Sequence, residues 1–376
     1  IVCCTVDTVL GIMQNQRRGL YAWPALAQSA FVFDEIHAYD EKLFGCLLRF
    51  LSDLQGVKVL LMTASLPTPR LAALQHALEE DEDTLAIISG PPDLERLERY
   101  HQETPADIDA RVREELQRGG RVLWICNVVN RAMDVADRFG DCNPLLYHSR
   151  FRYEDRVRRH KEVIASFEPG SSQSGRLAIC TQVAEMSLDI SATLLVSEIA
   201  PVPSLIQRLG RLNRHATASD LPPPTMPFVI EYPRDDSGEL KVKPYDLDTY
   251  PNWPELVEAW LAELGTTNIS QQSLANAWGN LTSEEDVQWI DSTWIDGGPT
   301  TQIDSVRTSS PGVTVIYGSL DADACRSDAS MIPKVSIPMP QPYGRQWTEW
   351  ERIKGAIVAP EESMEYDSQR GARWQK

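Results

Sequence analysis

Short apolar runs alternate with segments of helical periodicity over residues 1–235. The runs AFVFDE, VKVLLMT and RVLWIC are too short for buried helices, and each ends in a polar residue or a cysteine. Between them lie amphipathic segments such as EKLFGCLLRFLSDL at 41–54. Buried strands that alternate with helices require a parallel sheet with both faces covered. The sequence therefore predicts an α/β fold.

The alternation falls into two blocks. The first, residues 1–90, opens with IVCCTV, which we expect to be a buried strand, continues with a helix over 7–18 and ends with a helix after Pro67. The second, residues 91–235, begins with a charged, proline-bracketed stretch at 91–107 that is typical of a connector. Its later predicted elements are a strand at 121–126, a helix at 128–139, a strand in PLLYHS, a helix at 152–167, strands at 176–181 and 192–198, a helix at 203–212 and a strand at 227–233.

The rest of the chain does not continue this pattern. Tryptophans punctuate residues 236–300, where we predict a linker region of helices and loops. Residues 301–376 contain the short runs VTVIYGS and VSIPMP, whose β-branched residues indicate strands. These runs predict a small mixed domain at the carboxyl end.

The composition is that of a soluble globular protein. Hydrophobic residues make up 42% and charged residues 24% of the chain, and no apolar run approaches the ~18 residues of a membrane span. The seven cysteines lack the spacing of a zinc site, so we expect reduced thiols in a cytoplasmic protein.

The net charge of −18 disfavours nucleic-acid binding unless basic residues gather in one place. Such a gathering exists in residues 148–161. A basic groove and a solvated basic helix face are both compatible with it. The basic residues in question are Arg150, Arg152, Arg156, Arg158, Arg159 and Lys161.

An acidic pair follows the apolar run at 30–33. Asp34 and Glu35 are adjacent, and His37 comes two residues later. A carboxylate pair at the carboxyl end of a strand is how P-loop nucleotide hydrolases hold Mg²⁺ and orient the attacking water. This segment therefore indicates an ATP hydrolase that uses Mg²⁺.

Polar residues follow other predicted strands as well. The tripeptide TAS at 63–65 comes directly after VKVLLM, either as a plain polar strand end or as a link between an ATP site and a nucleic-acid site. Asn127 ends RVLWIC and could cap the next helix or contact a phosphate. Thr181 could bind a DNA phosphate, whereas Asp189 could receive a ribose hydroxyl or brace an arginine.

The segment QRLGRLNR, residues 207–214, is the most specific pattern. Arginines three and four residues apart lie on one face of a helix. Planar guanidinium groups suit the charge that develops on a transferred γ-phosphate. The pattern Q-R-x-G-R-x-x-R downstream of D-E-x-H therefore supports nucleotide hydrolysis.

The order of these motifs matches superfamily 2 helicases, and the chain resembles the helicase portion of the type I CRISPR helicase–nuclease family. DEIHAYD resembles that family's acidic motif, and TVDTVL resembles its DNA-contacting segment before it. YHSRFRYEDRVRRHKEVIASF and CTQVAEMSLDI are similar to its fourth and fifth motifs. The resemblance implies two RecA-like domains with parallel sheets, the first incomplete, and a small mixed accessory domain at the carboxyl end.

The resemblance also implies roles for residues of the first block. Asp34 would hold Mg²⁺ through water, and Glu35 would orient the hydrolytic water and accept its proton. His37 would couple ATP hydrolysis to DNA movement together with Thr63 and Ser65.

In the second block, the resemblance implies that Arg211 and Arg214 are arginine fingers for ATP, with Gln207 nearby. Asp189 would support the nucleotide side of the same site. The chain would bind single-stranded DNA mainly through phosphates. The candidate DNA contacts are Thr5, Asn127, Arg150 and Thr181.

Two features of that family have no counterpart in the sequence. There is no G-x-x-x-x-G-K-S/T loop for phosphates and no His-Asp dipeptide of a metal-dependent HD nuclease. We expect an amino-terminally truncated polypeptide that hydrolyses ATP negligibly by itself. The implied partners are single-stranded DNA, a Cascade-type effector complex and a fused or separate HD nuclease.

Two other functions fit the same residues. A DEAH-type RNA helicase shares the D-E-x-H and Q-R-x-G-R-x-x-R patterns, although the Ala-Tyr-Asp extension and the HSRF segment count against it. A non-catalytic remnant that binds DNA or Cascade is the alternative without enzyme activity.

Overall fold

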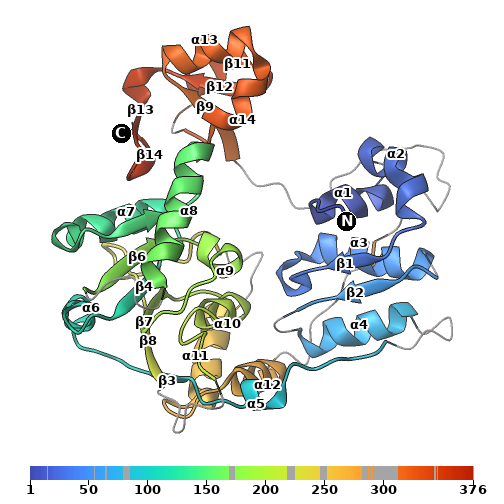
Figure 1. Cartoon of the computed structure of the whole chain (residues 1–376), viewed down its shortest axis with the longest axis vertical. Helices are drawn as coiled ribbons and strands as arrows, with labels where there is room; N and C mark the ends of the chain where they lie inside the picture. Colours follow the sequence, from blue (N-terminus) through green and yellow to red (C-terminus); the bar gives the residue numbers. More distant parts are fainter. Residues whose placement is uncertain are drawn as a thin grey trace. The chain divides into compact units, whose positions relative to one another are not determined.

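The computed structural model divides into two compact units (Figure 1). The first contains Ile1–Pro92 and Ala275–Ser310, and the second contains Asp93–Leu274 and Pro311–Lys376. Across the ranges described below, no helix combines the length and apolarity needed to cross a membrane. The structure describes residues 1–14, 16–54, 56–63, 66–78, 85–168, 174–217, 225–245, 252–281, 287, 289–290, 312–342, 344 and 346–375.

The first unit is built around two parallel strands, β1 (Phe31–Phe33) and β2 (Val59–Leu61), with Phe31 opposite Val59. Helix α3 (Glu41–Asp53) follows β1, and α4 (Thr68–Leu78) follows β2. Asp40 caps α3, because its side chain accepts the Leu43 N–H at 2.8 Å. These elements confirm the strands and helices that the sequence predicts at 30–78.

The two faces of this small sheet differ. Phe31 and Phe33 are buried, and both rings meet Phe50 of α3 edge-on, with centroids 5.1 and 5.5 Å apart. On the opposite face, Val32 is 63% and Leu60 47% exposed. Parallel sheets normally have both faces covered, so the described strands carry only part of the expected core.

The sequence prediction for the first residues is wrong. Residues 1–5 form no strand, and Ile1 and Val2 are exposed. The predicted single helix at 7–18 is instead α1 (Val6–Leu10), a 3₁₀ turn at Gly11–Gln14 and α2 (Arg17–Leu26). An apolar run becomes a strand only where a neighbouring strand can accept its backbone hydrogen bonds.

The second unit contains a six-stranded parallel sheet with the order β3-β8-β7-β4-β6-β5. Its four most central strands are buried along almost their whole length, as the apolar sequence requires. The strands are β3 (Tyr100–Gln102), β4 (Arg121–Ile125), β5 (Leu145–Tyr147), β6 (Arg176–Cys180), β7 (Leu194–Glu198) and β8 (Met226–Glu231).

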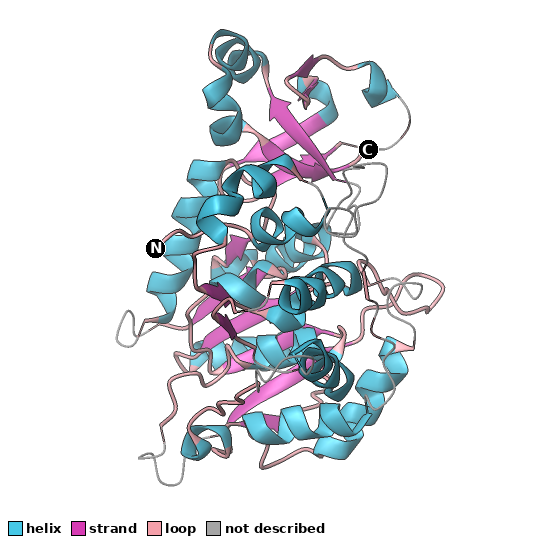
Figure 2. Ribbon diagram, turned by 90° about the vertical axis from the view of Figure 1, so that its right-hand side faces the viewer, coloured by secondary structure: helices cyan, strands magenta, loops and turns pink. Residues whose placement is uncertain are grey.

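Helices lie on both faces of this sheet (Figure 2). The helices are α6 (Ile108–Gln117), α7 (Val129–Arg138), α8 (Tyr153–Phe167), α9 (Val183–Ser187), α10 (Val202–Leu209) and α11 (Trp253–Leu264). On the face covered by α6 and α7, Trp124 of β4 packs with Val112 and Phe139. Its neighbours in the strand, Leu123 and Ile125, point to the opposite face and are fully buried there.

Strand β3 lies in the stretch 91–107 that we expected to be a connector. Tyr100 pairs with Met226 of β8, and its N–H and C=O also bond to Ile269. The tyrosine ring is fully buried. The sequence analysis missed this short strand because only Tyr100 of its residues lies in the core, so no apolar pattern stands out among the surrounding charged residues.

The carboxyl-terminal residues form a small mixed sheet with its own core, as predicted. Its order is β10-β9-β12-β11, in which β9 and β12 are parallel and the other pairs antiparallel. A separate hairpin joins β13 (Met364–Asp367) and β14 (Gly371–Trp374). The strands of the sheet are β9 (Gly312–Tyr317), β10 (Ile337–Pro340), β11 (Arg352–Ile353) and β12 (Ala356–Ala359), and the helices between β9 and β10 are α13 (Ser319–Ser327) and α14 (Ile332–Val335).

The residues predicted as a linker, 236–300, contribute to both units. Trp260 of α11 is fully buried in the second unit and donates its indole N–H to the Leu274 carbonyl at 3.1 Å. Further along, the Trp289 ring meets His76 of α4 in the first unit, with centroids 5.7 Å apart. Helix α12 (Gln271–Leu281) contains Leu274 of the first contact and precedes Trp289 of the second in the sequence.

Candidate functional site

The acidic pair lies where β1 ends in the first unit. Asp34 is exposed, and its Oδ1 accepts the Glu35 N–H at 2.9 Å. Glu35 has the left-handed backbone angles φ 55° and ψ 41°, which are uncommon for a residue other than glycine. This turn separates the two carboxylates, so that Asp34 faces solvent and Glu35 is directed toward His37.

Glu35, His37 and Thr63 form a hydrogen-bonded relay. The Glu35 carboxylate lies 3.2 Å from His37 Nε2, and the Thr63 hydroxyl lies 3.1 Å from His37 Nδ1. Since an ionised carboxylate can only accept, the imidazole proton is on Nε2, and Nδ1 accepts the Thr63 hydroxyl proton. The relay therefore joins the end of β1 to the end of β2 through one histidine.

The histidine of this relay is neutral at pH 7. Burial lowers the pKa of His37 to about 4; the Asp34 carboxylate opposes this shift and Arg70 adds to it. The His37 side chain is 1% exposed, whereas the Glu35 side chain is 34% exposed. A neutral donor thus orients a carboxylate that still reaches solvent. Of the two residues predicted to couple the sites with His37, Thr63 lies within hydrogen-bonding distance of it, and Ser65 lies outside the described residues.

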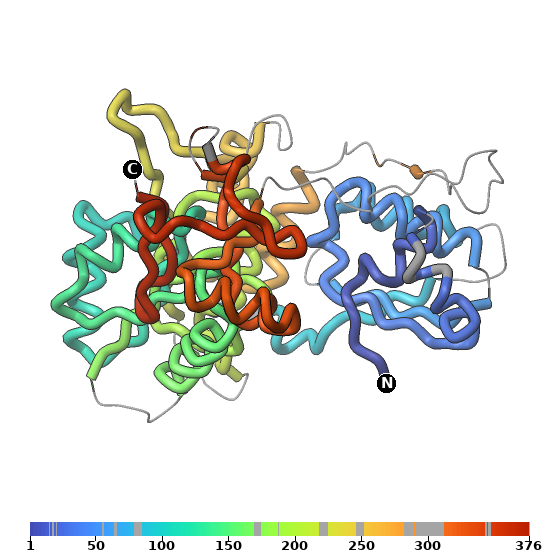
Figure 3. Tube along the Cα trace, turned by 90° about the horizontal axis from the view of Figure 1, so that it is seen from above, coloured from blue at the N-terminus to red at the C-terminus, as the bar shows by residue number. Residues whose placement is uncertain are grey.

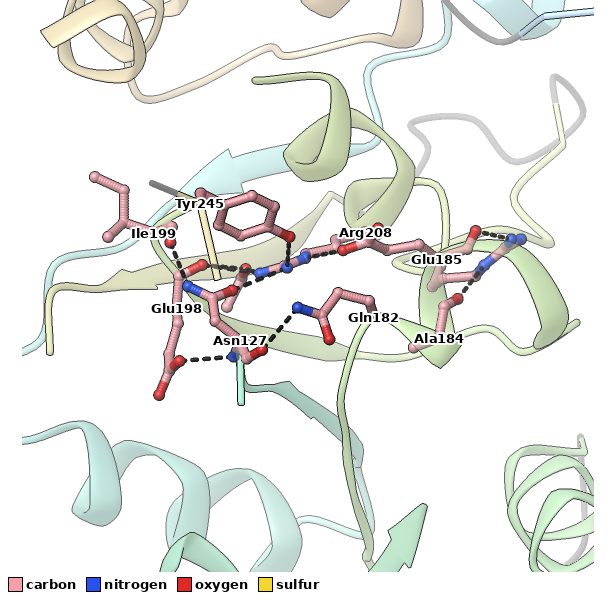
Figure 4. A network of polar contacts seen from close by, with 10 residues as sticks. Asn127, Gln182, Ala184, Glu185, Glu198, Ile199, Arg208 and Tyr245 are labelled. Atoms are coloured by element: carbon pink, nitrogen blue, oxygen red, sulfur yellow. Dashed lines mark hydrogen bonds and ion pairs between the residues drawn. The ribbon is translucent and has the colours of Figure 1, made fainter. Parts of the chain in front are cut away.

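In the second unit, a buried arginine organises the carboxyl edge of the sheet (Figure 4). Arg208 is fully buried and donates to the Glu185 carboxylate at 2.8 Å. Its remaining hydrogen bonds use the other four of its five N–H donors. Their acceptors are Ser197 Oγ at 2.9 Å, Glu198 O at 3.0 Å, Asn127 Oδ1 at 3.0 Å and Tyr245 Oη at 3.1 Å.

The same network holds the residues at the strand ends. Asn127 donates its side-chain amide to the Ile199 carbonyl and its backbone N–H to Glu198, both at 2.7 Å. Gln182 Nε2 donates to the Asn127 carbonyl at 2.7 Å. Burial raises the pKa of Glu185, and the Arg208 guanidinium opposes that shift.

Sequence analysis missed Arg208 and Glu185 as network residues. The signal was present, because Arg208 falls between Leu205 and Leu209 on the buried stripe of α10. An arginine at a core position of an amphipathic helix must find acceptors inside the fold. Tyr245 carried no such signal, since it follows a turn-rich stretch far along the chain.

The two predicted arginine fingers are both placed in the second unit, but not on a helix. Helix α10 ends at Leu209, and Asn213 has a positive φ of 48°, so the prediction of one helical face is wrong. Arg211 is 8% exposed and donates to the carbonyls of Ala184 at 3.0 Å and Glu185 at 2.5 Å. After α10 the backbone leaves the helix and pairs with Ala192, through bonds to the Arg211 carbonyl and the Asn213 N–H.

The other two residues predicted near these arginines take different positions. Arg214 is 41% exposed and pairs with Asp189 at 2.8 Å, so Asp189 braces an arginine, one of its two predicted uses. Gln207 lies half-buried on α10, between the residues that contact the sheet and those at the helix surface.

The candidate DNA contacts differ in exposure. Thr5 is exposed and shares a hydrogen bond with Thr8 at 3.1 Å. Asn127 and Thr181 are each 3% exposed at the carboxyl edge of the sheet. Arg150 is half-buried, and its Nη1 donates to Asn130 Oδ1 at 2.7 Å.

One predicted alternative for Asn127 is wrong. The residue that caps α7 is Val128, with no side-chain hydrogen bond. The Asn127 amide instead bonds to Ile199 and Arg208. A buried acceptor network holds the amide more strongly than the solvated N–H groups of a helix end.

Acidic side chains of the chain pair with three of the six basic residues in the segment 148–161. Arg152 pairs with Asp321 at 2.6 Å, Arg158 with Asp155 at 2.6 Å and Arg159 with Glu162 at 2.8 Å. Arg159 is 3% exposed. Neither a fully solvated basic face nor a uniformly basic groove describes this helix, because acidic partners take up three of its arginines.

The first unit fits Mg²⁺ and nucleotide only in part. A single exposed carboxylate such as Asp34 suits Mg²⁺ that is also held by phosphates and water. Among the described residues, no cluster of three or more His, Cys, Asp or Glu could hold a metal by itself. All seven cysteines are free thiols, as predicted.

Comparison with known proteins gives a consistent result. Residues 118–217 match the family model for the C-terminal part of the CRISPR-associated nuclease/helicase Cas3. A Myxococcus xanthus protein named as a Cas3 nuclease/helicase is 46% identical, with 99% of this chain and 49% of that protein covered. The Escherichia coli Cas3 is 30% identical over 56% of this chain and 28% of its own length.

The fold agrees with solved structures. The crystal structure of T. fusca Cas3-AMPPNP matches 98% of this chain and 56% of its own chain, with a TM-score of 0.69 and 18% identity. A CRISPR RNA-guided surveillance complex in a pre-nicking state covers 98% of this chain and 60% of its own, with a TM-score of 0.63 and 17% identity. At such identities the match establishes the fold. This chain spans half or less of the length of the curated relatives named above. It belongs to the CRISPR-associated nuclease/helicase Cas3 family.

Proposed function

We propose that this chain is the motor portion of an ATP-dependent single-stranded DNA translocase in type I CRISPR interference. A Cascade-type complex would recruit it, and an HD nuclease would cut the DNA that it delivers. The observation that carries the proposal is the Glu35–His37–Thr63 relay, with Glu35 3.2 Å from the histidine and open to solvent. A solvent-facing carboxylate held by a buried neutral donor is what a water-activating base requires.

In this proposal each charged residue has one task. Asp34 would hold Mg²⁺ through water, and the ion, when bound, would neutralise charge on the nucleotide phosphates. Glu35 would orient the attacking water and accept its proton. Arg211 and Arg214 would bring guanidinium charge to the γ-phosphate, with Asp189 bracing Arg214 at 2.8 Å.

The relay also supplies a physical route for coupling. His37 and Thr63 connect the carboxylate after β1 to the residues after β2 through two hydrogen bonds. A change at Glu35 during hydrolysis would alter the hydrogen bond at Thr63 without any change in the charge of the histidine. We propose that this link transmits nucleotide state toward the DNA-binding residues.

The first prediction concerns ATP hydrolysis by the 376-residue chain. Because its sequence has no glycine-rich loop with a lysine for the phosphates, we expect steady-state phosphate release with saturating single-stranded DNA to be negligible. An ordinary enzyme turns over at about 1–10³ s⁻¹; a rate within about tenfold of an ordinary helicase would contradict the prediction.

The second prediction concerns DNA binding. We expect the chain to bind a labelled single-stranded oligonucleotide more tightly than its RNA counterpart, with an affinity that falls as salt rises, because the contacts go mainly to phosphates. R150A should weaken binding about threefold to tenfold and reduce the salt slope by about 0.7. Fluorescence anisotropy measures both quantities.

The matched control is R326A. Arg326 is an exposed arginine that pairs with Glu351 on the small carboxyl-terminal sheet, so its loss should leave DNA affinity unchanged. Preference for RNA would favour the DEAH-type RNA helicase. Absence of salt-dependent binding to either strand would remove the proposed translocase role.

A further inference from the structure

The hairpin β13–β14 is anchored in the small carboxyl-terminal core. Met364 and Ala372 are fully buried there, and Trp374 donates its indole N–H to the Pro340 carbonyl at 3.0 Å. These contacts fix one side of the hairpin. Its other side contacts the segment between β5 and α8 of the same unit, and its arginines Arg370 and Arg373 pair with Asp137 and Asp134 of α7 (Figure 3).

That second contact is made to the backbone at 148–152. The Ala372 N–H donates to the Arg150 carbonyl at 2.8 Å. His148 Nε2 lies 2.9 Å from the Arg370 carbonyl, and His148 Nδ1 accepts the Arg150 N–H at 3.1 Å. A carbonyl only accepts, so Nε2 carries the proton, and this single tautomer satisfies both bonds.

Both peptide groups of Arg150 are therefore fixed by the hairpin. Its carbonyl is held directly by Ala372, and its N–H is held through His148, which is fully buried. Arg152 is held next to it, since its N–H donates to the Tyr366 hydroxyl at 3.2 Å. The Arg150 guanidinium is left to bond Asn130 at 2.7 Å on a half-buried surface.

Gly371 is what allows the hairpin to come so close. Its φ is +82°, and a Cβ there would lie 2.4 Å from His148 Cε1 and 2.6 Å from the Arg150 carbonyl oxygen. The second contact is backbone and cannot rotate away. Any side chain at position 371 must therefore separate the hairpin from the segment that carries Arg150.

We infer that the β13–β14 hairpin positions Arg150 for the DNA backbone, with Gly371 and His148 as the positioning residues. The inference rests on the proposed single-stranded DNA binding. Neither residue needs to touch DNA. Each acts by fixing the peptide groups on both sides of the Arg150 Cα, which sets the direction of its side chain.

The test compares G371A with G355A. Gly355 has φ +94°, and a Cβ added there would meet no atom of the described residues within 4 Å. Both substitutions therefore bear a similar backbone strain, and only G371A displaces the hairpin. We expect G371A to weaken single-stranded DNA binding by about threefold to tenfold, as R150A does, and G355A to leave it unchanged. Anisotropy well below the melting temperature measures both.

The double variant distinguishes an effect of Gly371 on Arg150 from a general effect of Gly371 on the fold. If Gly371 acts through Arg150, the R150A/G371A chain binds no more weakly than R150A alone. The inference would be overturned if the losses of DNA affinity in R150A and G371A added up in the double variant. It would also be overturned if R150A bound DNA more weakly while G371A and G355A bound it equally well. If the unaltered chain binds no DNA, the proposed function and the inference that rests on it both fall.

A milder variant covers the case in which G371A does not fold. Y366F removes the hydroxyl that accepts the Arg152 N–H and donates to Asp155, and it leaves the hairpin core unchanged. We expect about a twofold to threefold loss of DNA affinity that again disappears in the R150A background. An unchanged affinity in Y366F, or a loss of the same size in the R150A background, would refute the positioning role.

Discussion

Replacing Arg208 with methionine is expected to destabilise the second unit by about 3–5 kcal/mol. The guanidinium is fully buried and uses all five N–H donors, so its removal takes one hydrogen bond from each of five buried acceptors. The most costly of these is Glu185, whose side chain is 11% exposed. Urea unfolding, followed by pulsed hydrogen exchange in peptides from β7 and α10, measures the loss.

The protonation state of Glu185 gives this prediction a second readout. Burial already raises the pKa of Glu185, with Arg208 opposing, so loss of the arginine raises it further. A carboxyl group whose folded pKa is raised favours folding at low pH and opposes it as pH increases. The destabilisation by R208M should therefore be smaller at pH 5 than at pH 7.

Two variants control for the loss of an arginine as such. R214M removes an exposed arginine from the same segment, whose partner Asp189 is 76% exposed, and should cost about 0–1 kcal/mol. R208M/E185Q removes the buried charge that R208M leaves behind and should recover about 1–2 kcal/mol. A cost for R208M no larger than that for R214M would show that the network does not stabilise the unit.

The strands and helices of the second unit were predictable because their apolar periodicity is also their burial pattern. Periodicity fails where an element has few core side chains, as in β3, whose main buried residue is Tyr100. It also fails at element ends. The predicted helix at 203–212 ends at Leu209, because the backbone of Arg211 and Asn213 pairs with Ala192 instead of continuing the helix.

For the candidate site, the sequence indicated which residues carry charge but not which charges are used inside the fold. Arg208, Arg211 and Arg214 belong to one motif, yet their exposures are 0%, 8% and 41%. What separates them is the position of acceptors on other strands and loops. Likewise, a basic helix cannot be assigned to DNA from sequence alone when its partner Asp321 lies far along the chain.

Lowering the pH from 7 to 5 is expected to reduce the unfolding free energy of the second unit by about 2 kcal/mol through His148 alone. Burial lowers the pKa of His148 from 6.5 to about 3; the bond to the Arg370 carbonyl opposes the shift and Arg150 adds to it. Below pH 6.5, His148 binds a proton in the unfolded chain but stays neutral in the folded chain. Stability is therefore fully present above pH 6.5 and is lost progressively as pH falls toward 3.

The variant H148Q isolates this contribution. A glutamine amide can donate to the Arg370 carbonyl and accept the Arg150 N–H, as the neutral imidazole does, but it does not titrate. We expect H148Q to lose about 2 kcal/mol less than the unaltered chain between pH 7 and 5, with β4 peptides as the probe. His37, whose pKa is also lowered by burial, is common to both chains and cancels in the difference. The exposed His215 provides the matched control, and an H148Q chain as acid-sensitive as H215Q would show that His148 is not the buried, neutral link between the hairpin and Arg150.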